Sequence, residues 1–270
     1  MHSIFTVDCH VHTHRSACAD PVDIEDYLGR ARGLGVECFA ITDHSNDIYF
    51  DGEDRQCLKW KLEPPEFHDV IKKRSGRMDE YISHVGQYRD MGVRVGIELE
   101  QMPLSGDFIF DWGYRKEFDV VIGSVHSVPS VSRDGAMDAD AVREEFLSLT
   151  MKALEQDIDI LAHPTRSLHN AGIAVPGSYY EAIIDKAVSR GIPLEINSHS
   201  LNPEPEFVKK CVEKGARLAF CTDSHSLSEF GDFSFHKKLL KEAGINDETA
   251  RKHCFTPLQD FLRREERVTR

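Results

Sequence analysis

The stretch that decides the fold is Ile4-Phe5-Thr6-Val7-Asp8-Cys9-His10-Val11-His12-Thr13, an apolar β-like run that ends in two histidines. Because side chains alternate across a strand, His10 and His12 point the same way. Two imidazoles aimed at one point can chelate a divalent metal, since neutral imidazole is a common ligand of zinc, iron and related ions. The pair by itself fits two unrelated polar residues at a strand end equally well, so the rest of the chain has to decide.

The same arrangement, an apolar β-like run followed by His, Asp or Glu, recurs along the chain. Such residues end or follow six later runs, at Asp43-His44, Glu98, His126, His163, Glu195-Ile196-Asn197 and Asp223-Ser224-His225. Six of the fourteen histidines therefore stand at predicted strand ends. This recurrence favours a shared site over chance.

Short β-like runs alternate with helical patterns from one end of the chain to the other. We predict strands at Ile4–Asp8, Cys38–Thr42, Val93–Glu98, Phe118–Ser124, Ile158–Ala162, Ile192–Asn197 and Arg217–Thr222. We predict helices at Asp23–Leu34, Pro65–Met91, Asp140–Gln156, Ser178–Arg190, Glu204–Glu213 and Phe235–Ala243. This alternation is typical of parallel strands joined by crossover helices, and seven strands favour a closed or nearly closed α/β barrel.

The organisation along the chain predicts a single domain over residues 1–270. Its core spans about residues 4–245, and a helical tail follows at about 247–266. Asn46–Glu63 is polar and irregular, and we expect a surface loop there rather than a cover for a substrate. No Gly-x-Gly-x-x-Gly follows a strand and no Walker-type loop occurs, so nucleotide-binding folds lose support.

Composition limits the partners and the compartment. The net charge of −13 argues against a nucleic acid polymer as the main partner, because binding phosphate backbones needs a basic surface. Seven scattered cysteines without Cys-x-x-Cys indicate reduced thiols. No apolar run is long enough for a membrane span, and the first residues lack signal-peptide character. We therefore expect a cytoplasmic protein with no membrane partner.

In an α/β barrel, the C-terminal ends of the strands carry the active-site groups. About eight nitrogen and oxygen donors would meet there, whereas one zinc ion usually takes four ligands. The sequence therefore predicts a cluster of two or three divalent metal ions. Glu98 is the best candidate for a bridging carboxylate, and Asp223 could also bridge or could orient the nucleophile.

The order of these motifs resembles the PHP (polymerase and histidinol phosphatase) family. The matching segments are Asp8-x-His10-x-His12, Thr42-Asp43-His44, Gly96-Ile97-Glu98, Gly123-Ser124-Val125-His126, Ala162-His163-Pro164 and Thr222-Asp223-Ser224-His225. The resemblance implies a distorted, TIM-like (β/α)7 barrel, a trinuclear site of Zn, Fe or Mn, and phosphoester hydrolysis. The ligands it implies are His10, His12, His44, Glu98, His126, His163, Asp223 and His225. It is closest to stand-alone histidinol-phosphate phosphatases, which have a similar Ile-Gly-Ser-Val-His segment.

One ligand position departs from the family. The family usually supplies another His or Asp five or six residues after the second histidine of the first motif, where this chain has Ala17 and Cys18. Either Cys18 or Asp20 could take the role, or the third metal could be weak or absent; we favour Asp20 slightly. A thiolate would favour zinc, whereas a carboxylate would suit iron or manganese better.

The predicted reaction is hydrolysis of a small phosphorylated metabolite by a metal-activated water. His225 or His163 could protonate the leaving group. For the phosphate, Arg166 is the first choice, then Arg15, then Arg133. Histidinol phosphate is the favoured substrate, and the carboxylates available for its cationic groups are Asp51, Glu53, Glu100 and Asp107.

Rival functions stay open at this point. Nucleotides, sugar phosphates and phosphotyrosine are alternative substrates. An amidohydrolase is a less favoured reading, because no strand ends in the lysine that often bridges the metals of such enzymes. A non-catalytic metal-binding domain is also less favoured, because its ligand set would be expected to be incomplete.

Overall fold

Seven parallel strands form the centre of the molecule in the order in which they occur in the chain. The computed structural model describes residues 4–50, 67–102, 104–131 and 137–254. The strands are β1 Val7–Val11, β2 Cys38–Ile41, β3 Val93–Glu100, β4 Val120–Ser124, β5 Ile160–Leu161, β6 Leu194–Asn197 and β7 Leu218–Cys221. Each pairs in parallel with the next. This confirms the predicted α/β class and the distorted, TIM-like (β/α)7 barrel.

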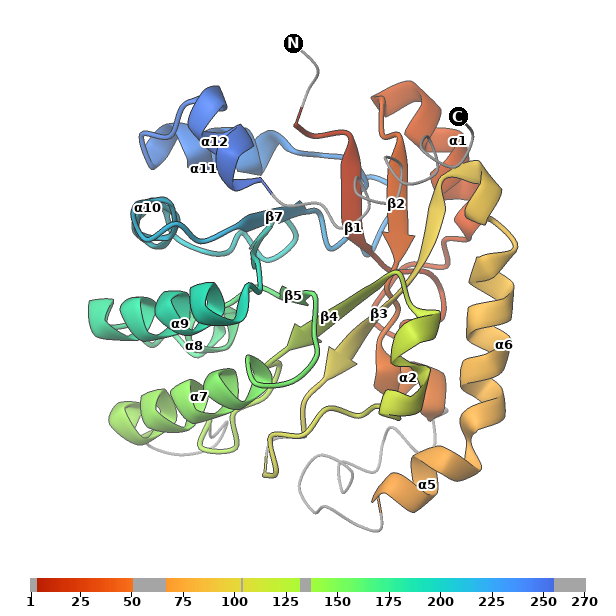
Figure 1. The fold of residues 1–270 in the computed structure, drawn as a ribbon, viewed down its shortest axis with the longest axis horizontal. Helices are drawn as coiled ribbons and strands as arrows, with labels where there is room; N and C mark the ends of the chain where they lie inside the picture. The colour runs from red at the N-terminus through yellow and green to blue at the C-terminus, as the bar shows by residue number, and fades with distance from the viewer. Residues whose placement is uncertain (1–3, 51–66, 103, 132–136, 255–270) are drawn as a thin grey trace.

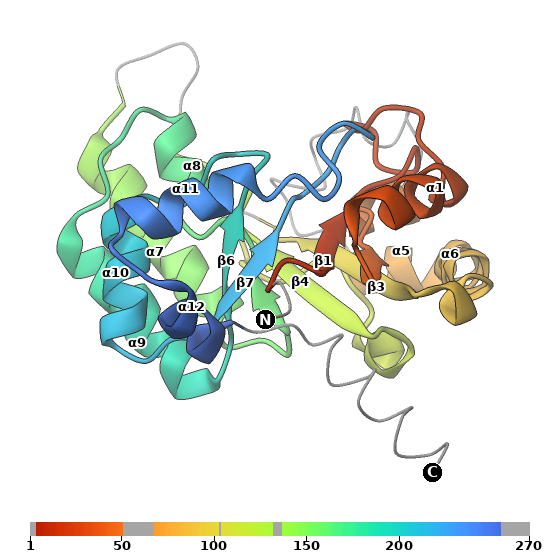
Figure 2. The same cartoon turned by 90° about the horizontal axis from the view of Figure 1, so that it is seen from above.

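Helices lie on the outside of these strands (Figures 1 and 2). Those on the side of β1 to β3 are α1 Ile24–Leu34, α2 Ser45–Tyr49, α5 Phe67–Lys73 and α6 Ser75–Gly86, with a 3-10 turn at Arg89–Met91. Those on the side of β4 to β7 are α7 Ala139–Ala153, α8 Arg166–Asn170, α9 Gly177–Arg190, α10 Pro205–Glu213, α11 Ser234–Glu242 and α12 Asp247–His253. A second 3-10 segment, Trp112–Glu117, precedes β4.

Hydrogen bonds between the first and last strands nearly close the barrel. The backbone N–H of His12 donates to the Ser224 carbonyl at 2.9 Å, and that of Ser224 donates to the His10 carbonyl at 3.2 Å. Below them, the Asp8 carboxylate accepts from the Thr222 backbone N–H at 3.0 Å. This closure brings residues more than 200 positions apart in sequence to the same end of the barrel.

Buried apolar residues of small and medium size fill the barrel interior. One buried apolar cluster consists of strand residues and Ala162, among them Val7, Cys38, Ala40, Ala219 and Cys221. The alternate strand positions, such as Phe39 and Phe220, belong to a second cluster that they share with the helices. On β3 a Cβ at Gly96 would lie 2.5 Å from the Thr42 side chain, so only glycine fits two positions before Glu98.

Most predicted elements are confirmed within a few residues, and the differences have local causes. The first strand is Val7–Val11 instead of Ile4–Asp8, because its pairing with β2 extends to Val11 through a register shift after Asp8. The single helix predicted at Pro65–Met91 is wrong: α5 and α6 are separated at Arg74, and a 3-10 turn ends at Gly92 with φ of 89°.

The predicted loop at Asn46–Glu63 is wrong at its start, where Ser45–Tyr49 forms α2. Residues 51–63 of that loop lie outside the described residues. The predicted tail begins as α12, and its part after residue 254 also lies outside them. Within the described ranges, no helix combines the length and apolar character needed to cross a bilayer.

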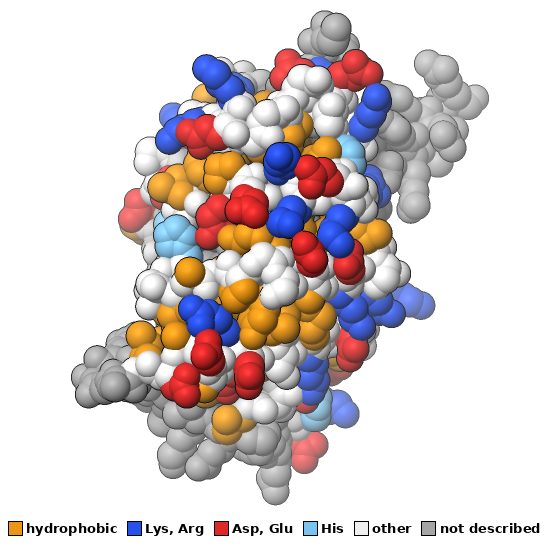
Figure 3. All heavy atoms as spheres, turned by 90° about the vertical axis from the view of Figure 1, so that its left-hand side faces the viewer, with side chains coloured by type: hydrophobic (Ala, Val, Ile, Leu, Met, Phe, Trp, Pro, Cys, Tyr) orange, Lys and Arg blue, Asp and Glu red, His pale blue; other side chains and the backbone are white. Residues whose placement is uncertain are grey.

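The helical face on the left of Figure 1 carries acidic and basic side chains side by side (Figure 3). Ion pairs cross the seams between neighbouring helices there, at Lys186–Glu155, Lys210–Glu181 and Lys214–Asp185. Exposed pairs of this kind contribute at most about 1 kcal/mol each, so the buried apolar clusters stabilise the fold far more.

Candidate metal centre

The C-terminal ends of the strands bring the predicted ligands together. His10 lies on β1 and His12 just after it, and Glu98 lies on β3. The others follow strand ends directly: His44 after β2, His126 after β4, His163 after β5, and Asp223 and His225 after β7. All eight have a side-chain atom within 3.6 Å of a donor atom of another member.

The innermost donors are two imidazoles and two carboxylates, all buried. His10 Nε2 and His12 Nε2 are 3.1 Å apart. Asp223 Oδ1 lies 3.3 Å from the first nitrogen and 3.0 Å from the second. Glu98 Oε2 lies 3.3 Å and 3.4 Å from the same two nitrogens.

The protons of the two imidazoles are held on the far side of each ring. His10 Nδ1 lies 2.7 Å from Glu195 Oε1, and a carboxylate can only accept. His12 Nδ1 lies 2.9 Å from Ser16 Oγ. The Ser16 hydroxyl donates to Asp43 at 2.7 Å, so it accepts from His12. In the neutral form of each ring, the Nε2 lone pair therefore points into the same space.

The carboxylates around His10 stabilise a positive charge in this part of the cluster. Burial alone would lower the pKa of His10, but the carboxylates of Asp223, Glu195 and Glu98 raise it well above its ordinary value. Burial and nearby His44 lower the pKa of His12 well below its ordinary value, so His12 stays neutral.

The donor set fits a metal ion. Two imidazole nitrogens bound to one tetrahedral zinc at about 2.05 Å each would be about 3.3 Å apart, close to the separation of His10 Nε2 and His12 Nε2. A cation between these lone pairs and carboxylate oxygens would remove their mutual repulsion. The described residues therefore could hold a metal here.

A second set of donors lies on the other side of Glu98. Its Oε1 atom is 3.2 Å from His126 Nε2 and 3.3 Å from His163 Nε2, and these nitrogens are 3.2 Å apart. Burial alone would raise the pKa of Glu98, but His126, His44 and His10 hold it well below its ordinary value. One carboxylate thus presents each of its oxygens to a different group of imidazoles, which is the arrangement that a bridging ligand requires.

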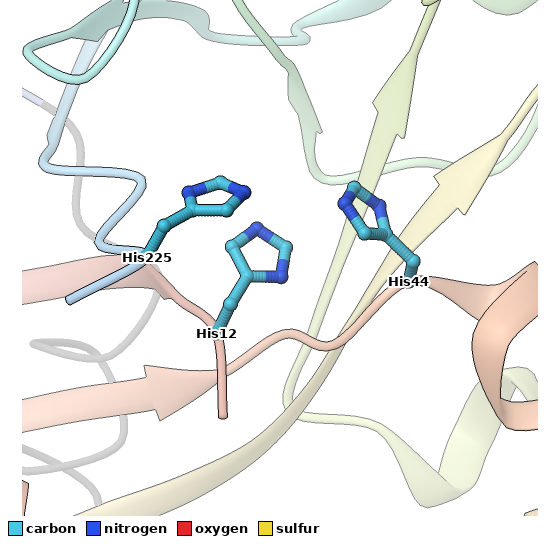
Figure 4. Close-up of side chains that lie close together, drawn as sticks. All are labelled: His12, His44 and His225. Atoms are coloured by element: carbon cyan, nitrogen blue, oxygen red, sulfur yellow. The ribbon is translucent and has the colours of Figure 1, made fainter. Parts of the chain in front are cut away.

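A third group is formed by His12, His44 and His225, whose donor atoms lie within 4.8 Å of one another. Their rings come from three strand ends and gather at one place (Figure 4), with the His12 ring centroid 4.5 Å from that of His44 and 4.4 Å from that of His225. Cys18 Sγ lies 3.3 Å from His44 Nε2. Burial would raise the pKa of this thiol, but hydrogen bonds with His225 and His44 lower it to about 7.

Asp20, which we slightly favoured as the additional ligand, is not brought into the cluster. Like Cys18, it is exposed and belongs to none of the groups of three or more potential ligands formed by the described residues. Its backbone N–H donates to the His225 carbonyl at 2.7 Å, which turns the loop so that the side chain two residues earlier faces the histidines. The structure therefore places Cys18, not Asp20, beside His44.

Of the three predicted phosphate-binding arginines, Arg166 is at the site. Its Nη1 atom lies 3.7 Å from Asp223 Oδ2. Arg15 instead pairs with Glu80 of α6 at 3.3 Å. Arg133 lies outside the described residues, as do Asp51 and Glu53.

An open pocket of about 340 Å³ leads to the cluster. It is lined by Ala17, Cys18, His44, Asn46, Asp47, Glu100, His126, Arg166, His199 and His225. Of the two described carboxylates expected to meet the substrate, Glu100 lines this pocket. Asp107 does not, and it pairs with Lys152 at 2.9 Å.

Glu195 and Asn197, which the sequence places at a strand end but to which it assigns no role, hydrogen-bond to members of the cluster. Glu195 Oε2 accepts from the His163 backbone N–H at 2.7 Å and from Asn197 Nδ2 at 2.9 Å. Asn197 Nδ2 also donates to Asp223 Oδ2 at 3.0 Å. The sequence contains a pattern that indicates such contacts: Glu195 and Asn197 alternate with the apolar Leu194 and Ile196. Their side chains therefore share the inner face of β6.

Two of the clustered residues have backbone conformations that side-chain-bearing residues rarely adopt. The φ angle is 25° at His163 and 55° at Asp223. Such strain persists only where the surroundings hold it, and it concentrates at functional sites. Here the hydrogen bonds from the inner face of β6 supply that support.

Comparison with known proteins agrees with this geometry. A model of the PHP domain family matches residues 8–199, more than half of the chain, and the chain therefore belongs to that family. It is similar to a protein of Aeromonas hydrophila named probable phosphatase, with 26% identity over 266 residues that cover 96% of this chain and 94% of the relative. A probable phosphatase of Acetivibrio thermocellus is 24% identical over 281 residues, covering 98% of this chain and 99% of the relative.

A solved structure shares the fold. The crystal structure of a Listeria monocytogenes protein assigned as the histidinol phosphatase hisK superposes with a TM-score of 0.65. The match covers 84% of this chain and 98% of that one, at 15% sequence identity. At this identity the likeness bears on the fold alone, and the family predicted from the motifs is confirmed by the family model.

Proposed function

We propose that this chain is a metal-dependent phosphatase that hydrolyses a small phosphomonoester. The observation that carries the proposal is Glu98, whose two oxygens face two separate groups of imidazoles. Adjacent divalent ions, when bound, clamp phosphoryl oxygens and lower the pKa of water so that it can attack phosphorus. The names of the relatives, probable phosphatase, support the same reaction class.

The chain's own residues then bind and orient the substrate. Arg166 lines the pocket, and its guanidinium offers the paired donors that a phosphate accepts. Asp223 is held between Asn197 and the nitrogens of His12 and His10, so its carboxylate is fixed in orientation at the deep end of the site.

The two predicted proton donors, His163 and His225, differ in whether they can be reached from the pocket. His163 is buried, with Nε2 directed at Glu98 and His126. His225 lines the pocket and stacks on His199, with ring centroids 4.2 Å apart. A proton for the leaving group would therefore come from the wall that His225 and His199 form.

Histidinol phosphate is the substrate we propose to test first. Arg166 offers a phosphate site, and Glu100 and Asp47 offer negative charge for an amine or imidazolium in the same pocket. The Asp47 carboxylate also accepts from the Ala17 backbone N–H at 2.6 Å, which keeps it at the pocket wall.

The test is phosphate release after reconstitution with Mn, Fe or Zn separately. The panel should contain histidinol phosphate, nucleoside monophosphates, sugar phosphates and a phosphotyrosine peptide. We expect turnover that is lost in Glu98→Gln and kept in Glu213→Gln, a matched change on the exposed end of α10. No phosphate release from any substrate by metal-loaded protein would refute the reaction class, and turnover of another phosphoester alone would refute only the substrate.

A further inference from the structure

We propose that a groove between the loop after β4 and α8 receives the uncharged part of the leaving group, and that the substrate is therefore a phosphomonoester of an alcohol or phenol with an apolar or aromatic body. The groove is a cavity of about 290 Å³ that borders His126 and is lined besides by Ser127, Val128, Val131, Ser167, Asn170 and Ala171. The inference rests on the proposed function and adds the chemical class of the leaving group.

The groove adjoins the metal cluster at His126. This ring lines both the groove and the main pocket, and its Nε2 atom lies 3.2 Å from Glu98 Oε1 and 3.2 Å from His163 Nε2. The two cavities also meet along α8, where Arg166 lines the main pocket and the following residue, Ser167, lines the groove. A phosphoryl group held by Arg166 beside His126 would therefore lie next to the groove.

The side chains of the groove suit an uncharged group. Apart from His126, the described residues that line it are neutral, and Val128, Val131 and Ala171 are apolar. Apolar or aromatic surface gains free energy when it is buried against such side chains. An ammonium would lose its hydration there without a carboxylate to replace it. A cationic group would instead stay in the main pocket, which Asp47 and Glu100 line.

The size of the groove suits one part of a substrate. Complete sites for small molecules usually have volumes of about 300–1,000 Å³. The groove, at about 290 Å³, is slightly smaller than that range, and the main pocket beside it has about 340 Å³. The phosphoryl group would therefore occupy the main pocket, and the body of the leaving group would occupy the groove.

Hydrogen bonds hold both walls of the groove in place. On one wall, the Ser130 backbone N–H donates to the Glu145 carboxylate of α7 at 2.8 Å. On the other, the Ser167 hydroxyl donates to the Val125 carbonyl, which ties α8 to the loop after β4. A cavity whose walls are already ordered binds its ligand without the entropic cost of ordering them.

The test compares probes that differ in the body of the leaving group, on the metal-loaded full chain. Phenyl phosphate carries an uncharged ring, methyl phosphate carries almost no body, and phosphoethanolamine carries an ammonium. Ala171→Phe should fill the groove and raise KM for phenyl phosphate by about tenfold or more, because losing one apolar contact in a pocket commonly costs about 10–200-fold. KM for the other two probes should not change. Ala174→Phe is the matched control, since Ala174 is exposed and does not line the groove.

Binding of benzylphosphonate gives a readout that needs no activity, because its P–C bond is not an ester. Calorimetry should show weaker binding in Ala171→Phe and in Val131→Ser, whereas methylphosphonate should bind all variants alike. Circular dichroism and metal content identify a variant that has lost its fold or its ions. If Ala171→Phe does not fold, Val131→Ser decides the question.

Two results would overturn the inference. One is a folded Ala171→Phe protein in which the kinetics of phenyl and methyl phosphate change equally, and the other is one in which neither changes. Failure of the proposed function is distinguishable from both. In that case the wild type would release no phosphate from any probe, while weaker binding of benzylphosphonate to Ala171→Phe would still support the groove as a binding site.

Discussion

Glu195 offers the sharpest test of how the donors of His10, His12, Glu98 and Asp223 are organised for a metal ion. Its Oε1 atom accepts from His10 Nδ1 at 2.7 Å, and its Oε2 atom accepts from the His163 N–H and from Asn197 Nδ2. Glu195→Gln keeps the shape but replaces one acceptor oxygen with an NH2 donor. Whichever way the amide turns, that donor faces another donor.

The consequence for the metal follows from the two orientations. If the NH2 group faces His10, then Nδ1 must accept, and the imidazole proton moves to Nε2, where the metal would bind. If it faces His163, two buried donors lose their acceptor at a cost of about 1–3 kcal/mol each. Losing an outer partner of a ligating histidine typically weakens metal affinity about 10–100-fold, which corresponds to about 1.4–2.7 kcal/mol.

The assay is competition with a chromophoric chelator, with metal content measured after dialysis. Circular dichroism of both metal-free proteins shows whether the variant keeps its fold. Glu213→Gln is the matched control, because this glutamate is exposed on α10 and far from the cluster in the fold. A folded Glu195→Gln protein that binds metal as tightly as the wild type would show that the contact with His10 does not set the affinity.

Four further outcomes are expected. Glu98→Gln should lose at least two ions and lower kcat by at least about 100-fold, measured as phosphate release with metal analysis. Arg166→Lys should raise KM by roughly 10–100-fold, with a larger effect for Arg166→Ala, because hydrogen bonds to charged groups contribute about 1.5–3 kcal/mol; an unchanged KM would exclude its contact with phosphate. Chelation of the metals should lower the free energy of unfolding by about 2.7 kcal/mol for each ion held at 100 times its dissociation constant, measured by denaturant titration. Burial lowers the pKa of His236 to about 4, although hydrogen bonds to the Ile196 and Cys221 carbonyls oppose this. Since the unfolded group titrates near 6.5, its contribution is complete above that pH, and roughly 3 kcal/mol is lost as pH falls to 4; His236→Gln should flatten this part of the stability profile.

Local sequence patterns were sufficient to predict the class of fold and most of the candidate ligands. Alternating β-like and helical segments imply parallel strands, and parallel strands with crossover helices put all their C-terminal ends on one side. Residues that follow those ends, such as His44, His126 and His163, must then face a common space. That inference needs no knowledge of side-chain contacts, because the topology is generic.

The predicted ends of helices and loops were wrong where tertiary contacts compete with local propensity. A long helical pattern ran through Pro65–Met91, yet the chain breaks at Arg74 and turns at Gly92 to enter β3. Likewise, Asn46 looked like loop but lies in α2, whose residues Ile48 and Tyr49 are buried in the core.

By itself, the sequence determined the family, the barrel and the set of donors that meet at its end, because these depend on periodicities and on the order of motifs. Only the tertiary structure shows that Cys18 lies beside His44, and that Arg166 lines the pocket whereas Arg15 pairs with Glu80. Arg15, Cys18 and Asp20 belong to one loop, whose path depends on hydrogen bonds to residues far away in the chain, such as that from the Asp20 N–H to the His225 carbonyl. The role of Glu195 was hidden for the same reason, since its partner His10 is 185 positions away and no local spacing records that contact.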